Sequence, residues 1–475
     1  MEIFVLGVAL LLPWAVGAVW LHALQSGSPR TPLLQPIAYG HLGGILVLTL
    51  LMRAMSAIGV RWSFMTLSLI LVALLVAGIA IGSRLGHKLK SGDPRPVAHI
   101  DPFPWRWLGI MAAILLVFRM GDLAYEVLLQ PIYPWDAWTQ WATKAKVWSA
   151  LHTMAPFIDY SQWLARQPGY VDTASHYPAT VPLMQAWMSL ALGRFDDALI
   201  NLPWLTLCVA LAAGIYAQAR ALRVAASWAM FITYAALSLP MLDTHVALAG
   251  YADLYVGAVF ALAVMSLLRW ERSREGIQLV YLAISIALLP TLKVPGVVWA
   301  ATLLLGLLVA AFGRTRGRVA AITLSIAAAT AVSVVALFRG KLVSVTGQAQ
   351  GEVVQPLFDN LFLFDNWHLL WYVLPIALAI GWRDAIHRSR GTSATLVAGF
   401  VFLWATFALT RAGNWVADYS TVNRALLHIA PAALVFGAVL VWEWAIRREV
   451  VSPIVELPIG DQPYAAASIS KPVGP

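Results

Sequence analysis

The chain has 475 residues, of which 60% are hydrophobic and only 12% are charged, and its formal net charge is +9. This composition excludes an ordinary soluble domain and indicates a membrane protein, because a soluble fold carries about twice as many charged residues. The single cysteine, Cys208, excludes an internal disulfide.

Apolar segments of nearly the length that crosses a bilayer recur along the whole chain. Helices satisfy their own backbone hydrogen bonds in lipid, so the expected fold class is all-α, a polytopic integral membrane protein. About thirteen such spans are expected. They are residues 3–24, 33–52, 63–82, 106–121, 198–219, 225–240, 250–268, 277–291, 296–312, 319–338, 368–382, 394–410 and 425–444.

The first span differs from a cleaved signal peptide. Glu2 precedes it without any Lys or Arg, and it is longer than the usual apolar core of such a peptide. We therefore expect a retained helix, one of three N-terminal spans in residues 1–105.

Basic residues predict the orientation, because cytoplasmic loops are enriched in Lys and Arg. One set of alternate connections carries most of them, including Arg84, Lys88, Arg220, Arg223, Arg269, Arg272, Arg274, Arg314, Arg316, Arg383, Arg388 and Arg390. That side is the expected cytoplasm, which places the N-terminus outside and the C-terminus, with a disordered tail at 446–475, inside. The net positive charge then reflects topology, and no nucleic-acid partner is expected.

The largest exterior connection, residues 122–197, contains PWDAWTQWATKAKVW (134–148) and SHYPATVP (175–182). Tryptophans at helical spacing predict an interfacial helix over 138–151. The apolar stretch 181–193 predicts a second helix that lies in the outer interface or dips partway into it. A full crossing at 181–193 would reverse the side of Arg220 and Arg223.

Asp136 is the candidate catalytic carboxylate of this connection. It lies beside Trp135 and Trp138, and Lys144 follows one helical face further on. A carboxylate, a cation and flat aromatic faces suit a sugar phosphate. The alternative for Asp136 is an ordinary helix N-cap. His176 and Tyr177 are candidate substrate-binding residues, and His176 could equally cap the following helix.

Ionisable side chains at the expected outer ends of spans are costly unless they are paired or hydrated, so they indicate function. They are Asp136, Lys144, Lys146, His176, Asp243, His245, Asp253, Lys293, Arg339, Lys341, Arg411, Asp418, Arg424 and His428.

Three of these residues, Asp253, Lys293 and Arg424, lie at the expected ends of later spans. Asp253 is a second candidate catalytic residue; as a structural carboxylate it would need Lys293 or Arg424 as a partner. Lys293 lies in the turn LKVP and Arg424 opens the last span, so both are candidate phosphate-binding residues. Snorkelling or a salt bridge is the alternative for each.

The order of these motifs resembles the GT-C superfamily of integral membrane glycosyltransferases, close to the group of protein O-mannosyltransferases and lipid A aminoarabinose transferases. Asp136 and His176-Tyr177-Pro178 take the places of the acidic residue and the Tyr-Pro element of the first exterior loop. Asp253, Lys293-Val294-Pro295 and Arg424 match the later motifs in order. The resemblance covers about residues 106–430, within an expected catalytic module at 106–445. Ala137 stands where the family has a second, adjacent acidic residue, which argues against a metal-bridged site.

The resemblance implies a polyprenyl-phosphate sugar donor, an acceptor on the exterior face and inversion at the anomeric carbon. Asp136 would be the general base, and Lys293 and Arg424 would hold the donor phosphate. The bacterial members that the chain is similar to imply the inner membrane. No His/Asp/Glu pattern with metal-ligand spacing occurs, so no cofactor is expected and a divalent cation is not favoured.

Two other classes remain open. A multi-span transporter or flippase of a lipid-linked or small polar substrate also combines many spans with a few membrane carboxylates. Transporters, however, usually carry such charges near the bilayer midplane and contain repeats. A polysaccharide polymerase or ligase would be expected to carry its main exterior loop late in the chain.

Overall fold

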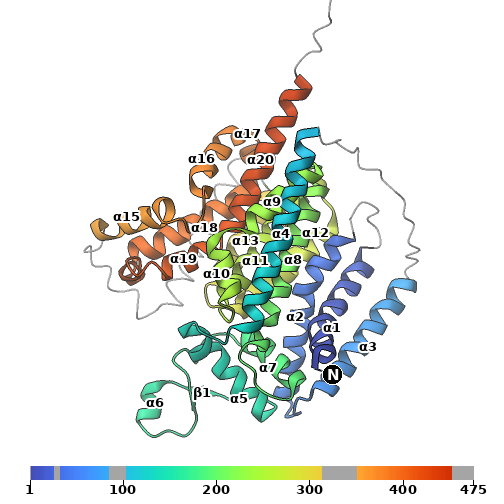
Figure 1. Ribbon diagram of the computed structural model, residues 1–475, viewed down its shortest axis with the longest axis vertical. Coiled ribbons are helices and arrows are strands. Elements are labelled where there is room, and N and C mark those ends of the chain that lie inside the picture. Colours follow the sequence, from blue (N-terminus) through green and yellow to red (C-terminus); the bar gives the residue numbers. More distant parts are fainter. Residues whose placement is uncertain (1, 26–32, 85–102, 313–349, 452–475) are drawn as a thin grey trace, which may run out of the picture.

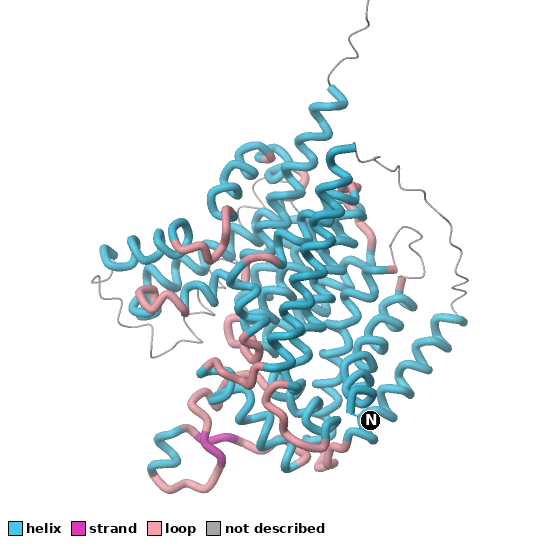
Figure 2. Tube along the Cα trace, viewed as in Figure 1, coloured by secondary structure: helices cyan, strands magenta, loops and turns pink. Residues whose placement is uncertain are grey.

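The computed structural model describes residues 2–25, 33–84, 103–312 and 350–451. Almost all of the regular structure in these residues is helical, which confirms the all-α class (Figures 1 and 2). The first helices are α1 (Glu2–Leu24), α2 (Leu34–Ala57), α3 (Phe64–Arg84), α4 (Phe103–Leu129), η1 (Ala137–Ala142), α5 (Thr143–Leu151), α6 (Tyr160–Leu164), α7 (Thr180–Leu192), η2 (Leu199–Asn201) and α8 (Leu202–Ala221). The remaining ones are α9 (Ala226–Leu237), α10 (Pro240–Ala247), α11 (Asp253–Ser273), α12 (Gly276–Leu292), α13 (Gly296–Phe312), α15 (Gln350–Phe358), η3 (Asp359–Leu363), α16 (Leu370–Ile380), α17 (Trp382–His387), α18 (Arg390–Leu409), η4 (Arg411–Trp415), α19 (Thr421–Leu427) and α20 (Ala430–Val451).

Eight of the described helices are long and apolar enough to cross a membrane. They are α1, α2, α3, α4, α8, α11, α18 and α20, a set compatible with a multi-pass membrane protein. The expected spans at 225–240, 277–291, 296–312 and 368–382 correspond to α9, α12, α13 and α16, which are shorter apolar helices. The expected span at 319–338 lies outside the described residues.

Two expected spans are interrupted by prolines. The segment 225–240 stops at Leu237, because Pro240 keeps the preceding residue extended and begins α10. The segment 425–444 is divided between α19 and α20, and Pro431 lies at the start of the second helix, where a missing N–H costs little. The second break places His428 between two helices.

Helix α11 is the centre of the bundle, and most of its side chains are buried by α8, α12, α13 and α20. Helices α1, α2 and α3 lie side by side at one edge (Figure 1). The connection between α4 and α8 is gathered at one end of the bundle, where it carries α5, α6, α7 and the parallel strands β1 (Phe157–Ile158) and β2 (Tyr170–Val171) (Figures 1 and 2). Helix α17 lies toward the other end.

The two helices expected in this connection are present, at slightly different bounds. The first is the π-helix η1 continued by α5. The second is α7, whose residues 180–189 are all buried, with α1, α2 and α5 among its neighbours. Helix α7 is therefore a packed part of the fold and does not lie free at a surface.

Candidate functional site

Asp253 begins α11 at the end of the bundle that carries the 122–197 connection. The chain enters the helix through Gly250, whose φ of +115° favours glycine. A Cβ at Gly250 would lie 2.7 Å from the Cβ of Ala137, so the missing side chain lets η1 approach the start of α11. Gly257, one turn later, similarly gives room to the Leu427 carbonyl of α19. Two segments far apart in the sequence are thereby brought to the same carboxylate.

The Asp253 carboxylate is almost fully buried, with 1% of its side chain exposed. Its Oδ1 accepts hydrogen bonds from Lys293 Nζ at 2.6 Å and His428 Nε2 at 2.9 Å. Its Oδ2 accepts from Arg424 Nε at 3.1 Å, and Arg424 NH2 lies at the same distance. Because a carboxylate has about four acceptor positions, Asp253 is saturated and cannot readily take a proton from a substrate. The geometry matches the structural alternative, in which both Lys293 and Arg424 are its partners.

His428 is held in one tautomer by its neighbours. Its Nδ1 faces the indole Nε1 of Trp299 at 3.0 Å, and an indole N–H can only donate. The His428 proton therefore lies on Nε2, which donates to Asp253. His428 was expected among the outer ionisable residues, without a role, because nothing in the local sequence shows that Trp299 and Asp253 flank it.

Arg424 joins the buried carboxylate to a second, more exposed one. Its NH1 donates to Asp136 Oδ2 at 2.7 Å, while the opposite edge of the guanidinium holds Asp253. The Tyr251 ring lies against the guanidinium, with 4.1 Å between the ring centroid and Cζ. Lys293, Asp253, Arg424 and Asp136 thus form one continuous chain of contacts, which we call the ion cluster. All four residues were candidates from the sequence.

The Asp136 side chain does not cap a helix, although the residue precedes η1. It makes no capping hydrogen bond, and besides Arg424 it accepts one from Gln140 Nε2 at 3.2 Å. About a quarter of the Asp136 side chain is exposed, compared with 17% for Arg424. The π-helical turn that follows is a form often found at functional sites. Asp136 is therefore the accessible carboxylate of the cluster.

Aromatic residues are frequent in the connection that carries Asp136. Trp135 and Trp138 are 66% and 45% exposed and pack edge to face. Tyr177 stacks on the buried Trp141 with 5.2 Å between ring centroids, and His176 is exposed beside it. Burial and the carboxylates of Asp253 and Asp136 raise the pKa of Tyr177.

Lys144 does not face the cluster as an available cation. It is 1% exposed, its Nζ donates to the Ala174 carbonyl at 2.7 Å, and it pairs with Asp172 at 3.2 Å. Burial lowers the pKa of Lys144 and raises that of Asp172. The expected substrate-binding role is therefore replaced by a structural one, in which Lys144 anchors the segment that leads to Tyr177. Asp172, which lies 28 positions further along the chain, was not anticipated.

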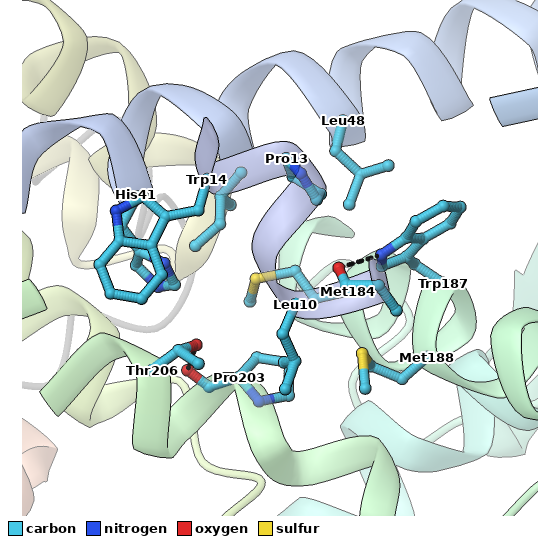
Figure 3. Close-up of a pocket in the computed structure, with 12 residues that line it drawn as sticks. Leu10, Pro13, Trp14, His41, Leu48, Met184, Trp187, Met188, Pro203 and Thr206 are labelled. Carbon is cyan, nitrogen blue, oxygen red and sulfur yellow. Dashed lines mark hydrogen bonds between the residues drawn. The ribbon is translucent and has the colours of Figure 1, made fainter. Parts of the chain in front are cut away.

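A small apolar cavity lies between α1, α2, α7 and α8, lined by residues that include Leu10, Trp14, His41, Met184 and Trp187 (Figure 3). Its volume of about 30 Å³ leaves room for no more than a few water molecules, so it is too small for a lipid tail. At its edge Trp187 Nε1 donates to the Ala9 carbonyl at 2.8 Å. Pro13 has no N–H to offer that carbonyl, so Trp187 supplies the hydrogen bond that α1 lacks.

Among the described residues, no group of three or more His, Cys, Asp and Glu side chains is arranged to hold a metal ion. The comparisons with known proteins add no identification: no protein-family model, no curated protein and no solved structure matches the chain.

Proposed function

We propose that the chain is a membrane glycosyltransferase that moves a sugar from a polyprenyl-phosphate donor to a hydroxyl of an exterior lipid, glycan or protein acceptor, with inversion. One observation carries the proposal: Arg424 bridges Asp136 and Asp253 while Lys293 completes the cluster. Candidates drawn from four distant parts of the sequence are thus in mutual contact. The proposal includes about thirteen crossings with the cluster on the periplasmic face of a bacterial inner membrane.

The charges of the cluster suggest how a phosphate would enter. Two cations face two carboxylates, so the ion cluster is neutral as it stands and does not attract an anion strongly. Asp253 is buried and held by three side chains, whereas Asp136 is partly exposed and held to Arg424 by one contact. A donor phosphate would therefore displace Asp136 from Arg424 and leave Asp253 in place.

This exchange would activate the base. Once its partner arginine holds the phosphate, the Asp136 carboxylate is free to accept the proton of the acceptor hydroxyl. The acceptor oxygen then bonds to the anomeric carbon as the bond from that carbon to the phosphate oxygen breaks. Arg424 and Lys293 stabilise the charge on the departing polyprenyl phosphate. Asp253 is a positioning residue in this scheme, because it orients both cations and does not touch the reacting atoms.

Asp136→Asn tests the assignment. With a panel of radiolabelled polyprenyl-phosphate sugars, we expect the variant to lose transfer to membrane acceptors by about 10²- to 10⁴-fold, the usual contribution of a general base. The loss should lie in kcat. KM for the donor should stay the same or fall, because in the variant the donor phosphate no longer has to displace a carboxylate from Arg424.

Asp122→Asn is the matched control, since Asp122 is 64% exposed on α4 and forms a long ion pair with Arg119 at 3.9 Å. It should transfer at the wild-type rate. Equal transfer by the Asp136 and Asp122 variants would remove Asp136 as the base. If the wild type transfers from no donor in the panel, the enzyme proposal fails and the transporter alternative takes its place.

A further inference from the structure

A second polar site lies at the opposite end of α11 from the ion cluster. With 21 residues at about 1.5 Å each, α11 places its two ends roughly 30 Å apart, the thickness of a hydrocarbon core. The last residues of α11, the end of α17 and the start of α18 surround a cavity of about 210 Å³. It is lined by Glu271, Arg272, Arg274, His387, Arg388 and Arg390, and we call it the basic cavity.

The acidic side chains around the basic cavity are already engaged. Glu271 accepts from the backbone N–H groups of Gly391 and Thr392 at 2.7 and 2.9 Å, so it caps the start of α18. Asp384 accepts hydrogen bonds from both terminal nitrogens of Arg447. Glu443 accepts from Arg272 at 2.8 Å.

Arginines outnumber carboxylates around the basic cavity. Counting the lining residues together with Asp384, Glu443 and Arg447, five arginines face three carboxylates, which leaves a formal charge of +2 with His387 neutral. Arg388 is 57% exposed, and its NH1 lies 3.7 Å from Asp384 Oδ1, which is too long for a hydrogen bond. The cavity is therefore suited to an anionic ligand.

Arg272 is the most buried arginine of the cavity lining for which an ion pair is known. Its side chain is only 11% exposed. One terminal nitrogen, NH2, donates to Ser389 Oγ and Glu443, whereas Nε and NH1 are buried and have no hydrogen-bond partner. Because both nitrogens are closed to solvent, a ligand in the cavity does not reach them, and Arg272 acts on the cavity through its charge.

We propose that the basic cavity binds a phosphate group, carried by an anionic lipid headgroup or by a soluble phosphate. Planar guanidinium groups recognise phosphate oxygens through paired hydrogen bonds. Basic pockets between helices at the cytoplasmic surface are typical headgroup sites, and this end of the bundle carries Arg269, Arg383 and Arg390 of the expected cytoplasmic connections. The site is independent of the proposed transferase reaction, since it shares no residue with the ion cluster.

The test uses the full chain in a neutral detergent. Phosphatidylglycerol, phosphatidylcholine of the same acyl length and inorganic phosphate are titrated separately, with bound adducts read by native mass spectrometry and Tm followed in parallel. We expect phosphatidylglycerol to bind and phosphatidylcholine not to bind. In the double variant Arg274→Gln/Arg388→Gln, the apparent Kd should weaken at least about tenfold, the loss of one charge-assisted pair.

Arg383→Gln is the matched control, because Arg383 is exposed at the same end, packs over Trp382 and does not line the cavity. If the double variant does not fold, Arg388→Gln alone serves, since this side chain is mostly exposed. Binding of phosphatidylglycerol alone identifies a headgroup site, and binding of inorganic phosphate as well identifies a soluble phosphate. Equal binding of both lipids, or wild-type affinity in the cavity variants, would overturn the proposal.

Discussion

Asp253→Asn should destabilise the protein far more than any other neutralisation in the ion cluster. The substitution keeps the shape of the side chain and removes its charge. It leaves Lys293, whose side chain is 10% exposed, facing an amide. Arg424 retains Asp136, but half of its pairing is lost. Removing one partner of a buried ion pair costs about 3–5 kcal/mol, because the remaining charge stays out of water.

Removing Lys293 as well should restore part of the lost stability. In Asp253→Asn/Lys293→Met the unpaired ammonium is gone, and Arg424 remains paired with Asp136. We expect the double variant to be more stable than Asp253→Asn alone, with a coupling energy of about 1–3 kcal/mol. Unfolding in detergent, followed by tryptophan fluorescence, measures the free energy of unfolding of each variant. Asp122→Asn should stay within about 0.5 kcal/mol of the wild type.

Two results would contradict this reasoning. A loss below about 1 kcal/mol in Asp253→Asn would mean that the carboxylate is not the partner of Lys293 and Arg424 in the folded protein. Additive losses in the double variant would mean that Asp253 and Lys293 do not interact.

Two further predictions concern the packing around the site. Trp187→Phe leaves the buried Ala9 carbonyl without a hydrogen-bond donor, so the free energy of unfolding should fall by about 1–3 kcal/mol and the Tm should fall with it. Trp163→Phe is the control, because Trp163 is 49% exposed, and its Tm should equal that of the wild type. Equal Tm values for the two variants would refute this prediction. Lys144→Met removes the cation that partly offsets burial at Asp172, so the pKa of Asp172 should rise further above 3.8 in the folded state. A folded pKa above the unfolded one gives stability that is complete below about pH 3.8 and is lost as the pH rises through the folded value, so the free energy of unfolding of Lys144→Met should fall with pH more steeply than that of the wild type. Adding Asp172→Asn should remove this extra slope, and a variant with the wild-type slope would show that the pair does not form.

The candidate residues could be found in the sequence because a membrane protein has few charges. Asp136, Asp253, Lys293 and Arg424 stand out among apolar segments, and prolines near Lys293 and Arg424 mark helix ends where such groups are tolerated. A charge among apolar residues was not a sufficient signal for Lys144, because the local sequence of a lysine beside tryptophans is the same whether the lysine faces a ligand or a buried carboxylate. Its partner Asp172 lies in a loop without periodicity, so no pattern connects the two.

Amino-acid composition and hydrophobic patterning by themselves determined the helical membrane class, most helix positions and the short list of ionisable residues, since these properties depend on local transfer energies and backbone hydrogen bonding. Which groups pair was decided only by the tertiary structure. Arg424 reaches Asp136 across 288 positions of the chain, and it does so because Gly250 and Gly257 let two distant segments, η1 and α19, approach the start of α11 closely. The same contacts separate the two carboxylates into a saturated, buried Asp253 and an accessible Asp136. The two carboxylates differ in burial and in the number of their hydrogen-bond partners, and both properties arise only when the helices pack.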